Sequence, residues 1–76
     1  MEHDGQLELY TAVAVRLKEA HSRVRALQVP EGVRMALTRK LLVITAVAKH
    51  DLADATRRLE RFTADLDEGR FPEEGL

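Results

Sequence analysis

Residues 41–48, Leu-Leu-Val-Ile-Thr-Ala-Val-Ala, form an apolar run in the middle of the chain that only Thr45 interrupts. The run lies in a segment with helical periodicity, where its apolar side chains cover more than one side of a helix. Such a helix must be covered on more than one side. This favours a central packing helix and predicts contact with a second chain. A β-strand is the alternative, but a lone strand would have no partner in this sequence.

The helix that contains the run is expected to span about residues 31–49. Pro30 suits its start, where a missing amide hydrogen is harmless. Its broad apolar face is predicted to comprise Val33, Ala36, Leu37, Leu41, Val43, Ile44, Val47 and Ala48. A narrower apolar stripe projects to the far side of the helix and consists of Met35, Leu42 and Ala46, here called the outer stripe.

A first helix is predicted over about residues 6–28, with Asp4 as its N-cap. Its apolar stripe has the heptad spacing of a helix that packs on other helices. The stripe consists of Tyr10, Val13, Leu17, Ala20, Val24 and Leu27. Pro30 closes this segment, because the residue before a proline is disfavoured in helical geometry.

A third helix is predicted over about residues 52–68. Asp51 is its expected N-cap, and Asp54 at the third helical position makes a carboxylate variant of the capping box. Gly69 and Pro72 end the segment in the usual way. The apolar stripe of this helix consists of Leu52, Ala55, Leu59, Phe62 and Leu66.

These segments predict an all-α fold, a three-helix bundle made of an antiparallel hairpin and an N-terminal helix. Only residues 49–51 join the second and third helices, so they are expected to pack antiparallel. We expect one domain over residues 1–76, with short acidic tails at both ends. A chain of 76 residues has a small core, and without cysteine it has no disulfide to support that core. Self-association, with a homodimer as the expected form, would add buried surface.

We expect the protein to be cytoplasmic. Its first residues lack the basic and apolar regions of a secretory signal, and its longest apolar run is too short to cross a bilayer. Charge is unevenly distributed, with eleven Lys or Arg against five Asp or Glu in residues 11–61, and acidic segments on either side. Nucleic-acid binding through Arg57, Arg58 and Arg61 is therefore the alternative function.

No catalytic or cofactor-binding site is apparent in the sequence, and we expect no catalytic activity, cofactor or structural metal. His3 at the third position could bind Cu(II) or Ni(II) together with the amino terminus. His50 lies beside Asp51 and Asp54, but both acids already have a role in capping the helix. Neither Ser22 nor Thr45 has a base at a spacing that would activate its hydroxyl.

The outer stripe is the feature that we expect to carry function. Either the first helix covers it within the same chain, or it is an exposed patch that pairs with another copy or a target protein. We favour the second interpretation. The sequence then predicts a small protein–protein interaction or regulatory module whose contacts are Met35, Leu42 and Ala46.

Overall fold

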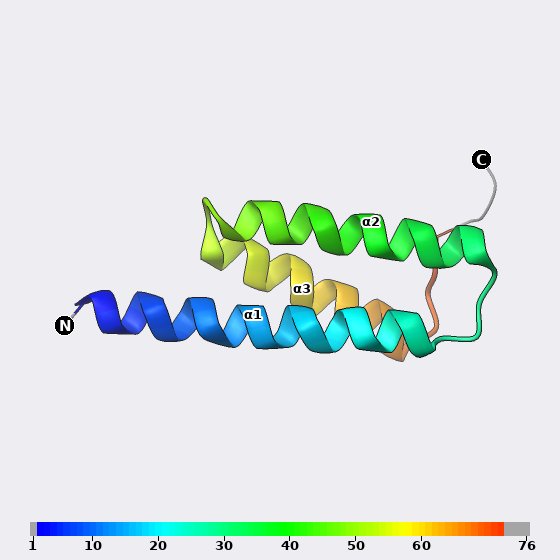
Figure 1. Cartoon of the computed structure of the whole chain (residues 1–76), viewed down its shortest axis with the longest axis horizontal. Coiled ribbons are helices and arrows are strands. Elements are labelled where there is room, and N and C mark those ends of the chain that lie inside the picture. The colour runs from blue at the N-terminus through cyan, green and yellow to red at the C-terminus, as the bar shows by residue number, and fades with distance from the viewer. Residues whose placement is uncertain (1, 73–76) are drawn as a thin grey trace.

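The computed structural model describes the backbone of residues 2–72 and the side chains of residues 8–72. It contains three helices, α1 (Glu2–Ala26), α2 (Glu31–Ala48) and α3 (Leu52–Asp67). As Figure 1 shows, α2 and α3 form an antiparallel hairpin and α1 packs along both, parallel to α3. The predicted all-α three-helix bundle is confirmed.

Two ion pairs show the register of α1 against α3. Arg23 contacts Asp67 at 2.8 Å, and two helical turns earlier Arg16 lies 4.0 Å from Glu60. Both pairs have the same separation along the chain, as expected for side chains on the flanks of two parallel helices. Because all four side chains are largely exposed, each pair contributes at most about 1 kcal/mol. They report the register of the helices more than they stabilise it.

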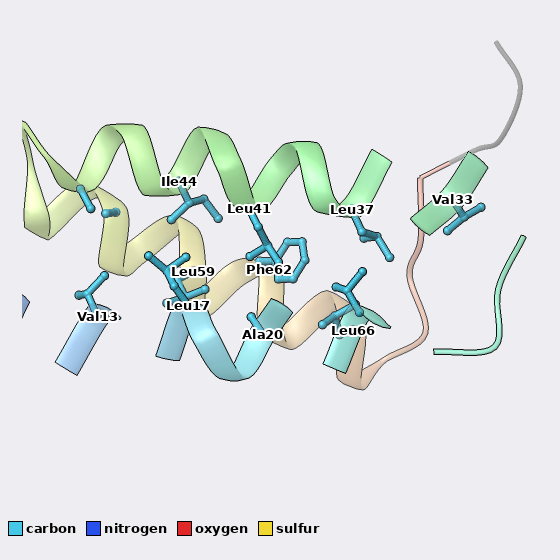
Figure 2. Close-up of a cluster of buried hydrophobic side chains, with 13 residues drawn as sticks. Val13, Leu17, Ala20, Val33, Leu37, Leu41, Ile44, Leu59, Phe62 and Leu66 are labelled. Carbon is cyan, nitrogen blue, oxygen red and sulfur yellow. The ribbon is translucent and has the colours of Figure 1, made fainter. Parts of the chain in front are cut away.

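The core is one cluster drawn from all three helices, and Figure 2 shows its side chains meeting between the ribbons. Leu41 and Leu59 are completely buried at its centre. The remaining buried members are Val13, Leu17, Ala20, Val24, Val33, Leu37, Ile44, Ala48, Ala55, Phe62 and Leu66. These residues belong to the predicted stripes, which confirms the face that each helix turns inward.

Two residues of the predicted apolar faces are exposed and lie outside the core. Tyr10 was expected in the stripe of α1 but is 49% exposed, and Val43 was expected on the broad face of α2 but is 48% exposed. Val43 lies at the edge of that face, beside a groove that α3 does not fill. The position of Tyr10 follows from the unequal lengths of the helices.

The N-terminal part of α1 extends past the end of the hairpin. At about 1.5 Å per residue, α1 is about 37 Å long and α2 only about 27 Å. Figure 1 shows the N-terminal end of α1 running beyond the turn between α2 and α3. Residues 2–10 of α1 are here called the overhang. The chain is accordingly elongated, with a radius of gyration of 13.4 Å, against about 11 Å for a compact domain of this length.

The start of α1 and its end both differ from the prediction. The helix already includes Asp4, so Asp4 is not its N-cap. It ends at Ala26 rather than near residue 28, and Pro30 is the residue that precedes the first turn of α2. Where α1 ends, the side chain of Arg34 binds its last carbonyls, as described below.

Both ends of α3 have the predicted caps, with one difference. The Asp51 carboxylate accepts a hydrogen bond from the backbone N–H of Asp54 at 3.0 Å. The reciprocal half of the capping box is not formed, because the backbone N–H of Asp51 donates to Val47 instead.

At the other end of α3, Gly69 has φ +74°. Its N–H donates to Leu66 and the N–H of Arg70 donates to Asp65, the two bonds of a Schellman motif. Gly69 therefore ends the helix, as the sequence predicted. No helix in the described part of the chain is both long and apolar enough to cross a membrane.

Candidate functional site

The outer stripe lies on the side of α2 that faces away from the core. Met35 is 55% exposed and Leu42 is 57% exposed, the two highest values among the large apolar side chains described, and Ala46 is exposed as well. At 100° per residue these three positions lie about 140° to 180° from the buried Leu37, on the opposite side of α2. Neither α1 nor α3 covers them. Of the two interpretations of the stripe, intramolecular cover by α1 is therefore wrong.

Arg34 explains why α1 packs on a flank of α2 and not on the outer stripe. Its guanidinium donates to three backbone carbonyl oxygens at the end of α1, those of Val24 at 2.6 Å, Arg25 at 2.9 Å and Leu27 at 2.8 Å. Its Nε lies 3.5 Å from the Glu31 carboxylate. The last carbonyls of a helix have no partners within the helix and carry partial negative charge, which a guanidinium satisfies well.

Sequence reasoning missed this role of Arg34. Arg34 lies on the polar flank between the two apolar faces of α2, and the sequence pattern alone gave it no partner. The available signal was a long cationic side chain in the first turn of α2, opposite a segment that ends without a glycine cap. Thr45, on the same flank, donates to the Leu41 carbonyl at 2.9 Å, a bond that a threonine within a helix commonly makes.

A groove of about 300 Å³ runs along the bundle between α2 and α3. Val43, Ile44 and Phe62 provide its apolar part. Four charged residues also line it, namely Lys40, Arg58, Arg61 and Asp65. Lys40 is exposed, in keeping with a long stem that lies on apolar surface while its ammonium reaches water.

The three arginines of the alternative function, Arg57, Arg58 and Arg61, do not all have the same contacts in the structure. Arg57 and Arg58 both bind the carboxylate of Asp54, at 3.2 Å and 2.8 Å. The hydrogen bond from Arg58 lowers the pKa of Asp54 below its ordinary value, and the positive charges of both arginines act in the same direction. Arg61 lies with Arg58 at the groove. The three residues therefore do not form one free cationic face.

A second groove, of about 290 Å³, lies between α1 and the last turns of α2. His21, on the flank of the α1 stripe, is half-buried there. Tyr10 and Lys49 lie at the same groove. Its other lining residues are Val13, Ala14, Leu17, Thr45 and Ala48.

The metal hypotheses gain no support from the described side chains. The side chain of His3 lies outside the described residues. His50 is exposed, while Asp51 caps α3 and Asp54 binds arginines. Among residues 8–72, no group of three or more potential metal ligands comes together.

The two hydroxyls considered as nucleophiles have ordinary structural contacts. Ser22 accepts a hydrogen bond from Arg25 at 3.3 Å, and Thr45 donates to the backbone of its own helix. The surfaces that stand out are thus the outer stripe, the two grooves and the overhang. Comparison of the chain with protein-family models, curated proteins and solved structures finds no match.

Proposed function

We propose that this protein is a small cytoplasmic interaction or regulatory module that forms a homodimer through the outer stripe of α2 and has no catalytic activity. The observation that carries the proposal is the exposure of Met35 and Leu42, with Ala46, directly opposite the core. Apolar side chains gathered on one face lose contact with water when a second copy covers them. Their burial is favourable by about 25 cal/mol for each Å² of apolar surface.

The total surface of the single chain supports this proposal. Its accessible area is 5585 Å², whereas a folded monomer of 8.6 kDa exposes about 4,700 Å². The excess of about 900 Å² reflects in part the elongated shape of the chain. It is also of the size, roughly 800 Å², that each partner buries in a standard interface.

The outer stripe is also suited to pairing with itself. In a two-fold pair the same patch meets its own copy. We propose the arrangement in which the two α2 helices cross antiparallel. A register that places Met35 of one copy opposite Ala46 of the other sets a large side chain against a small one at both ends of the stripe. The aliphatic stem of Arg39 then covers Leu42 of the other copy while its charge stays in water.

Sedimentation velocity at micromolar concentration tests the proposal with Leu42→Glu. We expect the wild type to sediment as a dimer in about 1 M NaCl, where long-range charge interactions are screened. The variant should sediment as a monomer with unchanged helicity by circular dichroism. Val15→Glu is the matched control, because Val15 is 50% exposed on the outer side of α1. A monomeric wild type, or a Leu42→Glu variant that remains dimeric, would contradict the proposal.

The nucleic-acid alternative has no comparable observation in its favour. Two of its three arginines already share Asp54 as a partner, and the chain carries a net charge of −1. Affinity for phosphate backbones comes mainly from cations gathered on one surface. We therefore do not adopt it.

A further inference from the structure

We propose that the groove between α2 and α3 binds the overhang of α1 from a second copy of this chain. This contact is separate from the outer stripe, and two copies related by a two-fold axis make it twice, each giving its overhang and receiving the other. Apolar complementarity and charge complementarity support it independently.

The groove has an apolar part and a cationic rim. Val43, Ile44 and Phe62 form the apolar part. Lys40, Arg58 and Arg61 supply three positive charges against the single negative charge of Asp65. Of the three cations, Arg58 already binds Asp54, which leaves Lys40 and Arg61 as the main determinants of charge preference. The groove thus fits an acidic segment that also carries apolar side chains.

The overhang has the complementary composition. The first ten residues contain three acids and no Lys or Arg, and the first cation along the chain is Arg16. Leu9 is 41% exposed and Tyr10 is 49% exposed. On the helical wheel both flank the inward-facing line of Val13 and Leu17. Tyr10 lies at the second groove beside Lys49, at the end of the hairpin, and about half of its surface stays exposed. The overhang therefore presents partly exposed apolar side chains together with a negative charge.

The overhang cannot fill the groove of its own chain. It continues α1 as one helix past the end of the hairpin, whereas the groove is lined by α2 and α3 in the middle of the bundle. Two overhangs packed against each other would bring two acidic segments together, which is unfavourable. Placing each overhang on a cationic groove is favourable, so charge selects this arrangement. The lengths also match, with about 13 Å of overhang for about 10 Å of groove along α3.

Salt dependence separates this contact from the outer stripe. The experiment uses the Leu42→Glu background, in which the outer-stripe dimer is absent. We expect Leu42→Glu to associate in about 0.05 M NaCl and to be monomeric in about 1 M NaCl, because salt screens the charges of an exposed contact. A Leu42→Glu protein that is monomeric at both concentrations would overturn the overhang contact and leave the outer stripe intact. Association that persists in 1 M NaCl would overturn the outer-stripe proposal instead.

Charge reversal locates the binding site. In the same background, Lys40→Glu with Arg61→Glu should abolish the low-salt association. Lys18→Glu with Arg25→Glu changes the net charge equally at exposed positions on α1 and should leave association within about twofold. An equal loss in both pairs would show that net charge alone matters and would overturn the proposed site.

Mixing two variants tests whether the overhang is the occupant. The groove variant, Lys40→Glu with Arg61→Glu, keeps its overhang, and an overhang variant, Leu9→Ser with Tyr10→Ser, keeps its groove. Neither should associate alone in low salt, while their mixture forms one of the two reciprocal contacts. We expect the mixed pair to bind at least about tenfold more tightly than either variant binds itself. A mixture that stays monomeric would overturn the proposal, provided that both variants retain wild-type helicity.

Discussion

The guanidinium of Arg34 donates a 2.6 Å hydrogen bond to the backbone carbonyl of Val24, ten residues earlier in the chain. Through this bond and those to Arg25 and Leu27, one side chain of α2 satisfies the end of α1. The linker between the helices therefore has little freedom, and α1 is held on the flank of α2 that carries Thr45. The outer stripe stays uncovered as a consequence.

Removing the Arg34 side chain is expected to weaken the whole bundle. Arg34→Ala leaves part-buried carbonyls without a charged donor, and such hydrogen bonds contribute about 1.5 to 3 kcal/mol. This is a large share of the roughly 4 to 11 kcal/mol expected for a domain of this length. Urea denaturation at a fixed protein concentration measures the loss.

Arg34→Lys is the informative control for that experiment. Lysine keeps the charge but lacks the planar fork that reaches several carbonyls at once. We expect it to recover less than half of the lost stability. Full recovery would mean that charge at the end of α1, and not hydrogen-bond geometry, determines the effect.

Leu41 and Leu42 are adjacent in sequence and are expected to respond in opposite ways to truncation. Leu41 is completely buried, so Leu41→Ala should cost about 2 to 5 kcal/mol of the free energy of unfolding. Leu42→Ala should change the stability of the monomer by less than about 0.5 kcal/mol, since its side chain faces outward. Denaturation at high salt and low protein concentration separates this difference from any effect of self-association.

Asp54 gives the stability a defined dependence on pH. The hydrogen bond from Arg58, together with the nearby positive charges, lowers the pKa of Asp54 in the folded state. A carboxyl with a lowered folded pKa stabilises the protein above its unfolded pKa of about 3.9, and this contribution is lost as the pH falls through the folded value.

Asp54→Asn should therefore destabilise the protein at neutral pH and flatten its loss of stability below about pH 4. Carbon-13 NMR titration of the carboxyl groups measures the pKa directly. A normal or raised pKa for Asp54 would contradict the contacts with Arg57 and Arg58.

Gly69 is expected to resist substitution because of its backbone conformation. Its φ of +74° lies in the left-handed region, and a Cβ added there would meet no neighbouring atom within 4 Å. Gly69→Ala should thus cost about 1 to 2 kcal/mol through backbone strain alone. Gly69→Asn, which tolerates this conformation better, should cost less. Thermal unfolding measures the stability of the two variants. An equal loss of stability in both would contradict backbone strain as the cause.

The sequence alone was enough to locate three helices, their inward faces and the caps of α3, because each depends on residues within a few positions of one another. Periodicity identified Leu41 and Leu59 as core, and Asp51 and Gly69 as helix boundaries. It also isolated the outer stripe as apolar surface outside the main face of α2. Local patterns are sufficient for such features, since helical geometry determines which side chains share a face.

Contacts between helices settled the rest. Whether Met35 and Leu42 are covered depends on the flank of α2 on which α1 packs, and Arg34 determines this by binding carbonyl oxygens far from it in sequence. The exposure of Tyr10 depends on where the hairpin ends relative to α1. Val43 is exposed because α3 leaves a groove beside it. Each outcome is set by the relative position of separate helices, which no local pattern encodes.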